Sequence, residues 1–223
     1  MLHPRTVTLA GQSVTVTRMG LGLAAVGRPG YINLGHREDL LEASDVEGLR
    51  RRAWALLDAA LAAGVGAFDA ARSYGLAEEF LAGWLKARGI APGHLFISSK
   101  WGYRYTAGWR RDAAVHEVKE HTLERFLAQR AETHDLLGDH LTLYQVHSAT
   151  LDSGLFAQPE LLAALATLRD EGVAIGLSVS GPAQGETIKR ALAVEFDGRR
   201  LFEAGPAPWD PRGRSAGPAP AAA

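Results

Sequence analysis

The sequence predicts an α/β protein whose parallel sheet follows the plan of a (β/α)8 barrel. Short apolar segments of strand type alternate with longer helical segments, which is typical of parallel sheets with helical crossovers. The glycine patterns that bind phosphate after the first strand of a doubly wound sheet are absent, since GLG at Gly20 to Gly22 is too short. Polar residues suited to chemistry instead follow several strands, as they do in a barrel.

The first elements are a β-hairpin, a strand and a helix. Residues 6–17 alternate β-branched and polar side chains around Ala-Gly-Gln, which predicts the hairpin, and the first buried strand follows at 19–22. After a glycine-rich loop, Ser44 and Glu47 suggest a capping box for a helix over 46–63. Helical spacing predicts one apolar face on this helix, formed by Leu49, Ala53, Leu56, Leu57, Ala60 and Leu61.

The alternation of strand and helix then repeats along the chain, with glycine at the ends of several helices. The further strands are expected at 65–70, 95–100, 141–147 and 173–180, with a weak sixth at 198–204. The further helices are expected at 76–89, within 113–130, at 159–172 and at 185–196.

Composition indicates an ordinary globular protein of the reducing cytoplasm. Of the 223 residues, 47% are hydrophobic and 22% are charged, and the net charge of −1 gives no global attraction for nucleic acid or anionic membranes. The absence of cysteine excludes disulfides and thiolate chemistry. The N-terminus lacks the pattern of a secretion signal, and no apolar run approaches the length of a membrane span. We therefore expect no nucleic-acid or membrane partner, and place the Arg50–Arg52 run on a solvent-exposed helix side.

Metal sites are not expected from the sequence. His116 and His121 in HEVKEH are five positions apart, or about 140° around a helix, so they do not share the face that a zinc-protease helix needs. A second group, placed in a linker before the fourth barrel strand, represents the main alternative enzyme class, a metal-dependent hydrolase. It consists of His134, Asp135, Asp139 and His140.

Four residues of complementary chemistry follow consecutive strands. Asp69, Lys100 and His147 each end an expected strand, and Tyr74 comes five positions after Asp69. One βα unit separates neighbouring strand ends, which brings them together on one face of a barrel. A buried ammonium near a phenol stabilises the phenolate, a carboxylate holds the ammonium, and a neutral imidazole donates a hydrogen bond to a carbonyl oxygen. Such a set suits carbonyl reduction once a cofactor supplies hydride.

The stretches AFDAARSYG, ISSKWG and YQVHSA resemble those of the aldo-keto reductases, and the resemblance runs from about residue 6 to residue 200. It implies a TIM-type (β/α)8 barrel with a hairpin across its bottom, which reduces aldehydes or ketones to alcohols with NADPH and has no Rossmann fold. By this resemblance Tyr74 is the acid/base, Lys100 lowers the pKa of Tyr74, Asp69 supports Lys100, and His147 orients the carbonyl.

The same resemblance implies a cofactor site at the strand ends. Gly22, Asp69 and Ser178 are the expected cofactor-binding residues. Ser178 matches a serine that holds the nicotinamide carboxamide in this family, whereas Val179 stands where an asparagine is common. The aromatic segment 101–109 (WGYRYTAGW) is expected either to wall a substrate pocket or to form a surface loop.

The end of the chain departs from the family pattern. Six strands can be counted where a barrel needs eight, and 15 of the last 20 residues are Ala, Gly or Pro. We expect a partial barrel over residues 1–203 and a disordered tail over 204–223 without a buried strand, through a frame shift near residues 202–205 or a natural truncation. The open strand edges suggest self-association. A non-catalytic remnant that binds a partner or a nucleotide is the alternative function.

Overall fold

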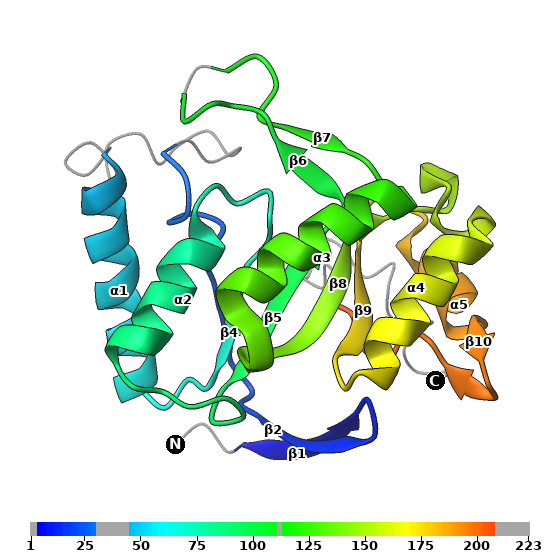
Figure 1. Ribbon diagram of the computed structural model, residues 1–223, viewed down its shortest axis with the longest axis horizontal. Coiled ribbons are helices and arrows are strands. Elements are labelled where there is room, and N and C mark those ends of the chain that lie inside the picture. Colours follow the sequence, from blue (N-terminus) through cyan, green and yellow to red (C-terminus); the bar gives the residue numbers. More distant parts are fainter. Residues whose placement is uncertain (1–3, 30–44, 111–112, 208–223) are drawn as a thin grey trace.

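The computed structural model describes residues 4–29, 45–110 and 113–207, and its centre is a five-stranded parallel sheet (Figure 1). The sheet has the order β3-β4-β5-β8-β9. Its strands span β3 (Leu21–Gly22), β4 (Ala67–Asp69), β5 (Phe96–Trp101), β8 (Leu141–Ala149) and β9 (Ala174–Val179). Each of them overlaps one of the first five expected barrel strands, so the parallel α/β prediction is confirmed.

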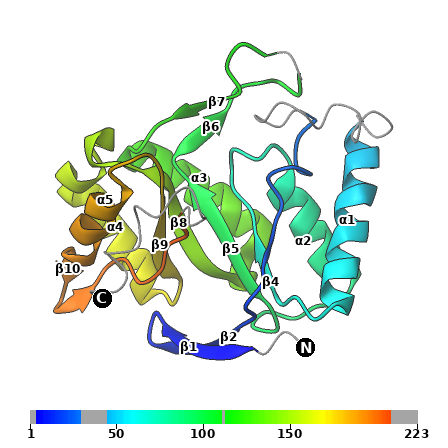
Figure 2. The same ribbon diagram turned by 180° about the vertical axis from the view of Figure 1, so that it is seen from behind.

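Helices pack against one face of this sheet, as the opposite views in Figures 1 and 2 show for α2, α3 and α4. The helices are α1 (Val46–Ala62), α2 (Ala77–Ala87), α3 (Leu123–Leu137), α4 (Pro159–Asp170) and α5 (Gln184–Leu192). Three short 3-10 turns, η1 (Gly138–His140), η2 (Leu151–Ser153) and η3 (Leu155–Ala157), connect to β8 and α4. Among the described residues, no helix is both long and apolar enough to cross a membrane.

An N-terminal hairpin lies below the amino ends of the strands, as predicted (Figure 1). It pairs β1 (Arg5–Leu9) with β2 (Gln12–Val16) through a turn in which Ala10 and Gly11 have φ values of 48° and 74°. Positive φ at both turn residues matches the twist of a two-residue hairpin. Leu9 packs with Leu143 and Ala174, which anchors the hairpin to β8 and β9.

Helix α1 differs from the prediction at its cap and on its apolar face. Asp45 is the N-cap, since its side chain accepts a hydrogen bond from the Gly48 amide, and Ser44 lies outside the described residues. Leu56 and Leu61 are 41% and 37% exposed. The helix buries a narrower stripe, formed by Gly48, Leu49, Ala53 and Leu57.

The prediction of a helix within 113–130 was wrong for the residues before Leu123. Residues Glu117–Lys119 form β7, which pairs antiparallel with β6 (Tyr103–Tyr105), so the histidines of HEVKEH do not lie on a helix. Helix α3 begins only at Leu123, where the Thr122 side chain caps it by accepting a hydrogen bond from the Arg125 amide. The strand is formed by antiparallel pairing with β6, which the local sequence of residues 116–119 does not encode.

The second group of possible metal ligands does not lie in a linker either. His134 and Asp135 belong to the last turn of α3, and Asp139 and His140 belong to η1. Across residues 4–29, 45–110 and 113–207 there is no cluster of three or more His, Asp or Glu side chains suited to a metal ion.

The weak sixth strand expected at 198–204 does not form a strand of the main sheet, and only Ala204 bridges to Gly176 of β9. Arg199–Arg200 form β11, which pairs antiparallel with β10 (Glu195–Phe196) outside the main sheet. The chain then runs parallel to β9: the Glu203 amide donates to the Ile175 carbonyl, and the carbonyls of Ala204 and Pro206 accept from Leu177 and Val179. This pairing involves only backbone atoms of residues that are half-buried or exposed, so the expectation that the proline-rich segment forms no buried strand stays a prediction. Pro206 is tolerated because only its carbonyl takes part.

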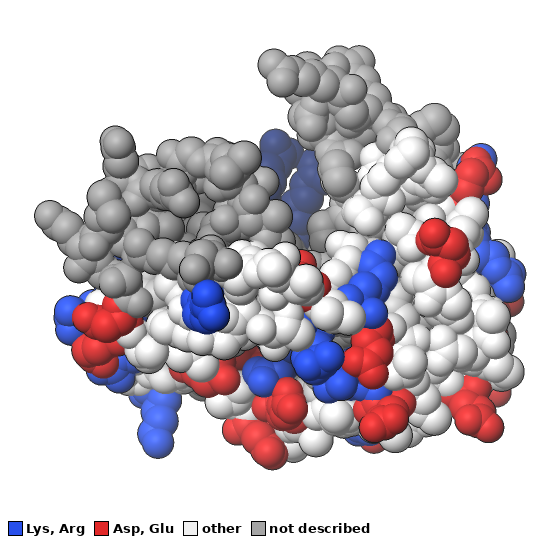
Figure 3. Space-filling model, turned by 90° about the horizontal axis from the view of Figure 1, so that it is seen from above, with Lys and Arg blue, Asp and Glu red and all other residues white. Residues whose placement is uncertain are grey.

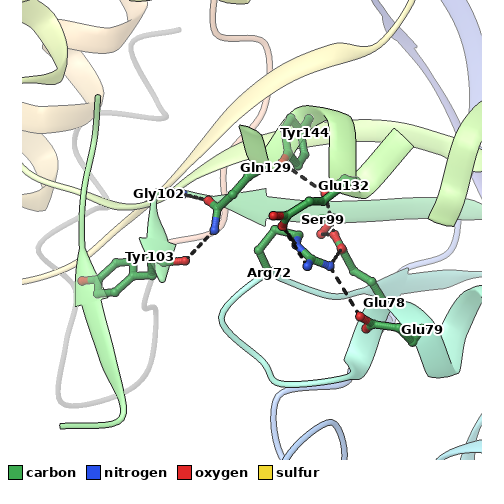
Figure 4. Close-up of polar contacts among 10 residues, drawn as sticks. Arg72, Glu78, Glu79, Ser99, Gly102, Tyr103, Gln129, Glu132 and Tyr144 are labelled. Atoms are coloured by element: carbon green, nitrogen blue, oxygen red, sulfur yellow. Dashed lines mark hydrogen bonds and ion pairs between the residues drawn. The ribbon is translucent and has the colours of Figure 1, made fainter. Parts of the chain in front are cut away.

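A buried carboxylate, Glu78, ties three elements together on the helical side of the sheet (Figure 4). Its side chain is 0% exposed and pairs with Arg72, from the loop after β4. It also accepts hydrogen bonds from Ser99 of β5 and Thr133 of α3. Arg72 in turn contacts Glu79 and Glu132, which completes the network. A buried charge held by several donors is costly to disrupt, because its removal leaves the partners unpaired.

We predict that Glu78→Ala lowers the free energy of unfolding by roughly 3–5 kcal/mol, because it leaves the Arg72 guanidinium partly buried without its main partner. Urea unfolding followed by circular dichroism measures the change. The control is Glu186→Ala, which removes the exposed pair with Lys189 and should have a much smaller effect. Equal midpoints for the two variants would contradict the structural role of Glu78.

Candidate active site

The carboxyl ends of the parallel strands meet at the end of the sheet opposite the hairpin, and the four expected catalytic residues lie there. Asp69 is the last residue of β4, Lys100 is the penultimate residue of β5, and His147 lies two positions before the end of β8. Tyr74 lies in the loop after β4 and is half-buried. The structure brings all four together, as the sequence predicted.

Asp69 and Lys100 form a fixed ion pair at the base of the site. Lys100 is 5% exposed, and its ammonium donates to Asp69 and to the Ala70 carbonyl. The other carboxylate oxygen of Asp69 accepts hydrogen bonds from Ser98 and Gln145, at 2.6 and 3.2 Å. With both oxygens engaged, the carboxylate cannot rotate away from Lys100. The ammonium therefore stays near Tyr74, with its nitrogen 4.9 Å from the centroid of the phenol ring.

Tyr74 and His147 face each other through their polar atoms. The phenol oxygen lies 3.4 Å from His147 Nε2, and the two rings are nearly perpendicular. The loop that carries Tyr74 is held against residue 27, since the Leu76 amide donates to the Gly27 carbonyl. A Cβ at residue 27 would lie 2.2 Å from the Tyr74 carbonyl, so only glycine allows this contact.

Burial keeps His147 neutral. His147 is 9% exposed, and its pKa is lowered to about 3. The larger cause is the loss of hydration on burial, and the positive charge of Lys100 is the second. Its neighbour His121 donates from Nε2–H to the His147 carbonyl, at 2.9 Å, and burial lowers the pKa of His121 to about 4. A neutral imidazole carries one N–H, so it can donate a single hydrogen bond to a substrate oxygen.

Two further residues at the site, Arg28 and Ser73, were missed by the sequence analysis. Arg28 is 1% exposed, lies 5.6 Å from the centroid of the Tyr74 ring, and donates to the Ser73 carbonyl and to Glu117. Ser73 Oγ lies 3.3 Å from His147 Nδ1. Ser73 could have been found, since it directly precedes Tyr74 in ARSYG. Nothing in the glycine-rich loop singles out Arg28.

Part of the aromatic segment lines the site, which supports the first of its two interpretations. The centroids of the Tyr103 and His147 rings are 4.9 Å apart. Trp101 is fully buried and packs against Phe126, whereas Trp109 packs far from this point, beside Leu49, Ala53 and Phe80. Tyr103 is therefore the member of the segment that contacts an expected catalytic residue.

The expected cofactor residues lie along the same end of the sheet. Gly22 pairs in register with Asp69, and no atom lies within 4 Å of the position where a Cβ would stand, so a flat ring has room there. Ser178 Oγ accepts a hydrogen bond from the Ser148 amide at 2.8 Å, which leaves its proton to donate to an acceptor. These features fit a nicotinamide group. At the next position, where the family commonly has an asparagine, this chain has Val179, whose backbone amide donates to the Pro206 carbonyl.

A cavity of about 630 Å³ lies at the opposite end of the strands and is separate from this site. The hairpin, the α3 residues Arg130 and His134, and the segment after α4 line it. None of the four catalytic candidates contributes to its wall. Chemistry, rather than cavity size, locates the candidate site.

Comparison with known proteins agrees with this geometry. The model of the Aldo/keto reductase family matches residues 19–197. An aldo-keto reductase structure from Pseudomonas aeruginosa is 25% identical, with a TM-score of 0.69 over 97% of this chain and 71% of its own. Two others are similar in fold. An aldo-keto reductase from Bacillus halodurans is 23% identical, with a TM-score of 0.57 over 84% of this chain and 55% of its own. A glycerol dehydrogenase from Gluconobacter oxydans is 20% identical, with a TM-score of 0.55 over 81% of this chain and 50% of its own.

A search of curated proteins found no match. The family model nevertheless covers most of the chain, and it includes all four residues that converge at the strand ends. The chain belongs to the aldo/keto reductase family, oxidoreductases that use nicotinamide cofactors and act on small carbonyl compounds.

Proposed function

We propose that this chain interconverts an aldehyde or ketone with the corresponding alcohol, with Asp69, Tyr74, Lys100 and His147 as the catalytic set. The observation that supports it most strongly is the 3.4 Å approach of the Tyr74 hydroxyl to His147 Nε2, with the Lys100 ammonium beside the same phenol ring. A carbonyl oxygen placed near these two polar atoms would meet a proton donor and a hydrogen-bond donor together.

Each residue has one task in the reduction. Tyr74 gives its proton to the carbonyl oxygen as negative charge develops there, and Lys100 stabilises the phenolate that remains. Asp69 holds Lys100 in place. Neutral His147 donates its N–H to the same carbonyl oxygen and fixes its orientation. A bound nicotinamide supplies or accepts the hydride.

NADP(H) is the cofactor we propose, because the chain resembles a family that uses it. Gly22 would accommodate the ring, Ser178 would donate to the carboxamide, and Asp69 would border the site.

Residues 1–203 would form the reductase unit and 204–223 a tail. We place the protein in the cytoplasm because it has no cysteine.

The substrate we propose is a small carbonyl compound rather than a nucleic acid or a membrane component. Tyr103 supports this, since its ring lies beside His147 and offers an apolar wall close to the reacting oxygen. On the face shown in Figure 3, acidic and basic side chains of the described residues are interspersed, so this view offers no basic stripe of the kind that tracks a phosphate backbone.

We predict that Tyr74→Phe abolishes carbonyl-dependent oxidation of NADPH, with a loss of at least about 100-fold in kcat, since the variant lacks the proton donor. Nucleotide fluorescence titration of the purified chain should show that the variant still binds NADPH, and a parallel NADH titration tests the cofactor preference. Binding without turnover in the unmodified chain would instead favour a nucleotide-binding remnant.

The role of His147 requires a neutral ring, which leads to a prediction on pH. Because the pKa of His147 is lowered to about 3, its ring proton shifts in NMR should stay constant from pH 8 to pH 5. Between pH 6.5 and about 3 the unfolded chain binds a proton at this residue that the folded chain does not. The free energy of unfolding should therefore fall as pH is lowered through this window, and less steeply in His147→Gln. A titration of the ring near pH 6.5 would refute the assignment.

We also propose self-association through the edges of the sheet. In the part of the chain that the structure describes, β3 pairs with β4 alone, and residues 203–206 pair with β9 alone. Unpaired strand edges favour pairing with another copy. Light scattering after size-exclusion chromatography should show a mass that rises with concentration, and a constant monomer mass would exclude this proposal.

A further inference from the structure

His147 is held at both of its ring nitrogens. Nε2 faces the Tyr74 hydroxyl at 3.4 Å, and Nδ1 faces Ser73 Oγ at 3.3 Å. Ser73 is 1% exposed, so water has little access to its side chain. A neutral imidazole has one N–H and one lone pair, and the partner of one nitrogen decides the state of the other.

We propose that Ser73 is a positioning residue that holds His147 in the tautomer protonated at Nε2. In this arrangement the Ser73 hydroxyl donates to the lone pair of Nδ1, and Nε2–H points toward Tyr74 and the incoming carbonyl oxygen. The inference rests on the proposed reductase chemistry, because the value of an Nε2–H lies in donating to that oxygen.

The opposite tautomer would be unproductive. With the proton on Nδ1, the lone pair of Nε2 would accept the Tyr74 hydroxyl proton, which is the proton that the carbonyl needs. Productive proton transfer to a carbonyl therefore requires the arrangement in which Nε2 donates to Tyr74 and Ser73 donates to Nδ1.

The position of Ser73 is fixed from both sides. Its own carbonyl accepts a hydrogen bond from the buried Arg28 guanidinium at 2.9 Å. The preceding residue, Arg72, donates its amide to the Lys100 carbonyl and pairs with the buried Glu78. A hydroxyl on such a restrained segment keeps its direction, as a tautomer-setting group requires.

The test is long-range ¹H–¹⁵N NMR of the chain labelled at histidine, recorded without cofactor, with the His147 signals assigned by their loss in His147→Gln. We expect the Nε2–H pattern in the unmodified chain, a mixture of tautomers in Ser73→Ala, and the original pattern in Ser73→Thr, which keeps the hydroxyl. In steady-state assays kcat should fall roughly 10-fold in Ser73→Ala with little change in KM, and recover in Ser73→Thr.

The spectra test the role of Ser73 and the assays test the proposed reductase activity, so the two proposals can be refuted independently. An Nδ1–H pattern in the unmodified chain, or an unchanged pattern in Ser73→Ala, overturns the role of Ser73 even if the chain is active. The expected patterns in a chain without turnover would leave the role of Ser73 intact and overturn the proposed reductase activity instead. If Ser73→Ala failed to fold, an Nδ1–H pattern in the unmodified chain would still overturn the proposal.

Discussion

The geometry of the site depends on a single buried carboxylate. Glu78 has no exposed surface, so its charge is tolerated only because Arg72, Ser99 and Thr133 surround it. Arg72 lies two residues before Tyr74, and Ser99 directly precedes Lys100. The demand for donors around Glu78 therefore fixes the backbone just before Tyr74 and Lys100, although Glu78 itself lies on the helical side of the sheet.

Lys100 and His147 are both buried, but their neighbours differ in charge. Lys100 is buried beside a carboxylate that is restrained at both oxygens, so its charge has a partner. His147 is equally buried but faces positive neighbours and hydroxyl groups, so it stays neutral, with its pKa at about 3. The neutral state of His147 thus follows from its surroundings rather than from residue type alone.

Sequence reasoning succeeded where one regular element sets a residue's position. Asp69, Lys100 and His147 sit near the ends of neighbouring parallel strands, so the repeat of the βα unit was enough to bring them together. It failed where tertiary contacts override local pattern. Residues Glu117–Lys119 were expected within a helix but form β7 through pairing with β6. The backbone contacts of Ala204 and Pro206 with β9 were likewise not expected from a proline-rich segment. Arg28 is positioned by contacts across the chain, which no local motif encodes.

Helix α3 connects the two halves of the site. Through Thr133 it donates to Glu78 and so supports the segments of Tyr74 and Lys100. Through Gln129, one turn earlier, it accepts from the Gly102 amide and donates to the Tyr103 carbonyl (Figure 4). Tyr103, whose ring lies beside His147, and the segments of Tyr74 and Lys100 are thus fixed to the same helix. A shift of α3 would move the segments of Tyr103 and Tyr74 together, so the separation of these two side chains is preserved.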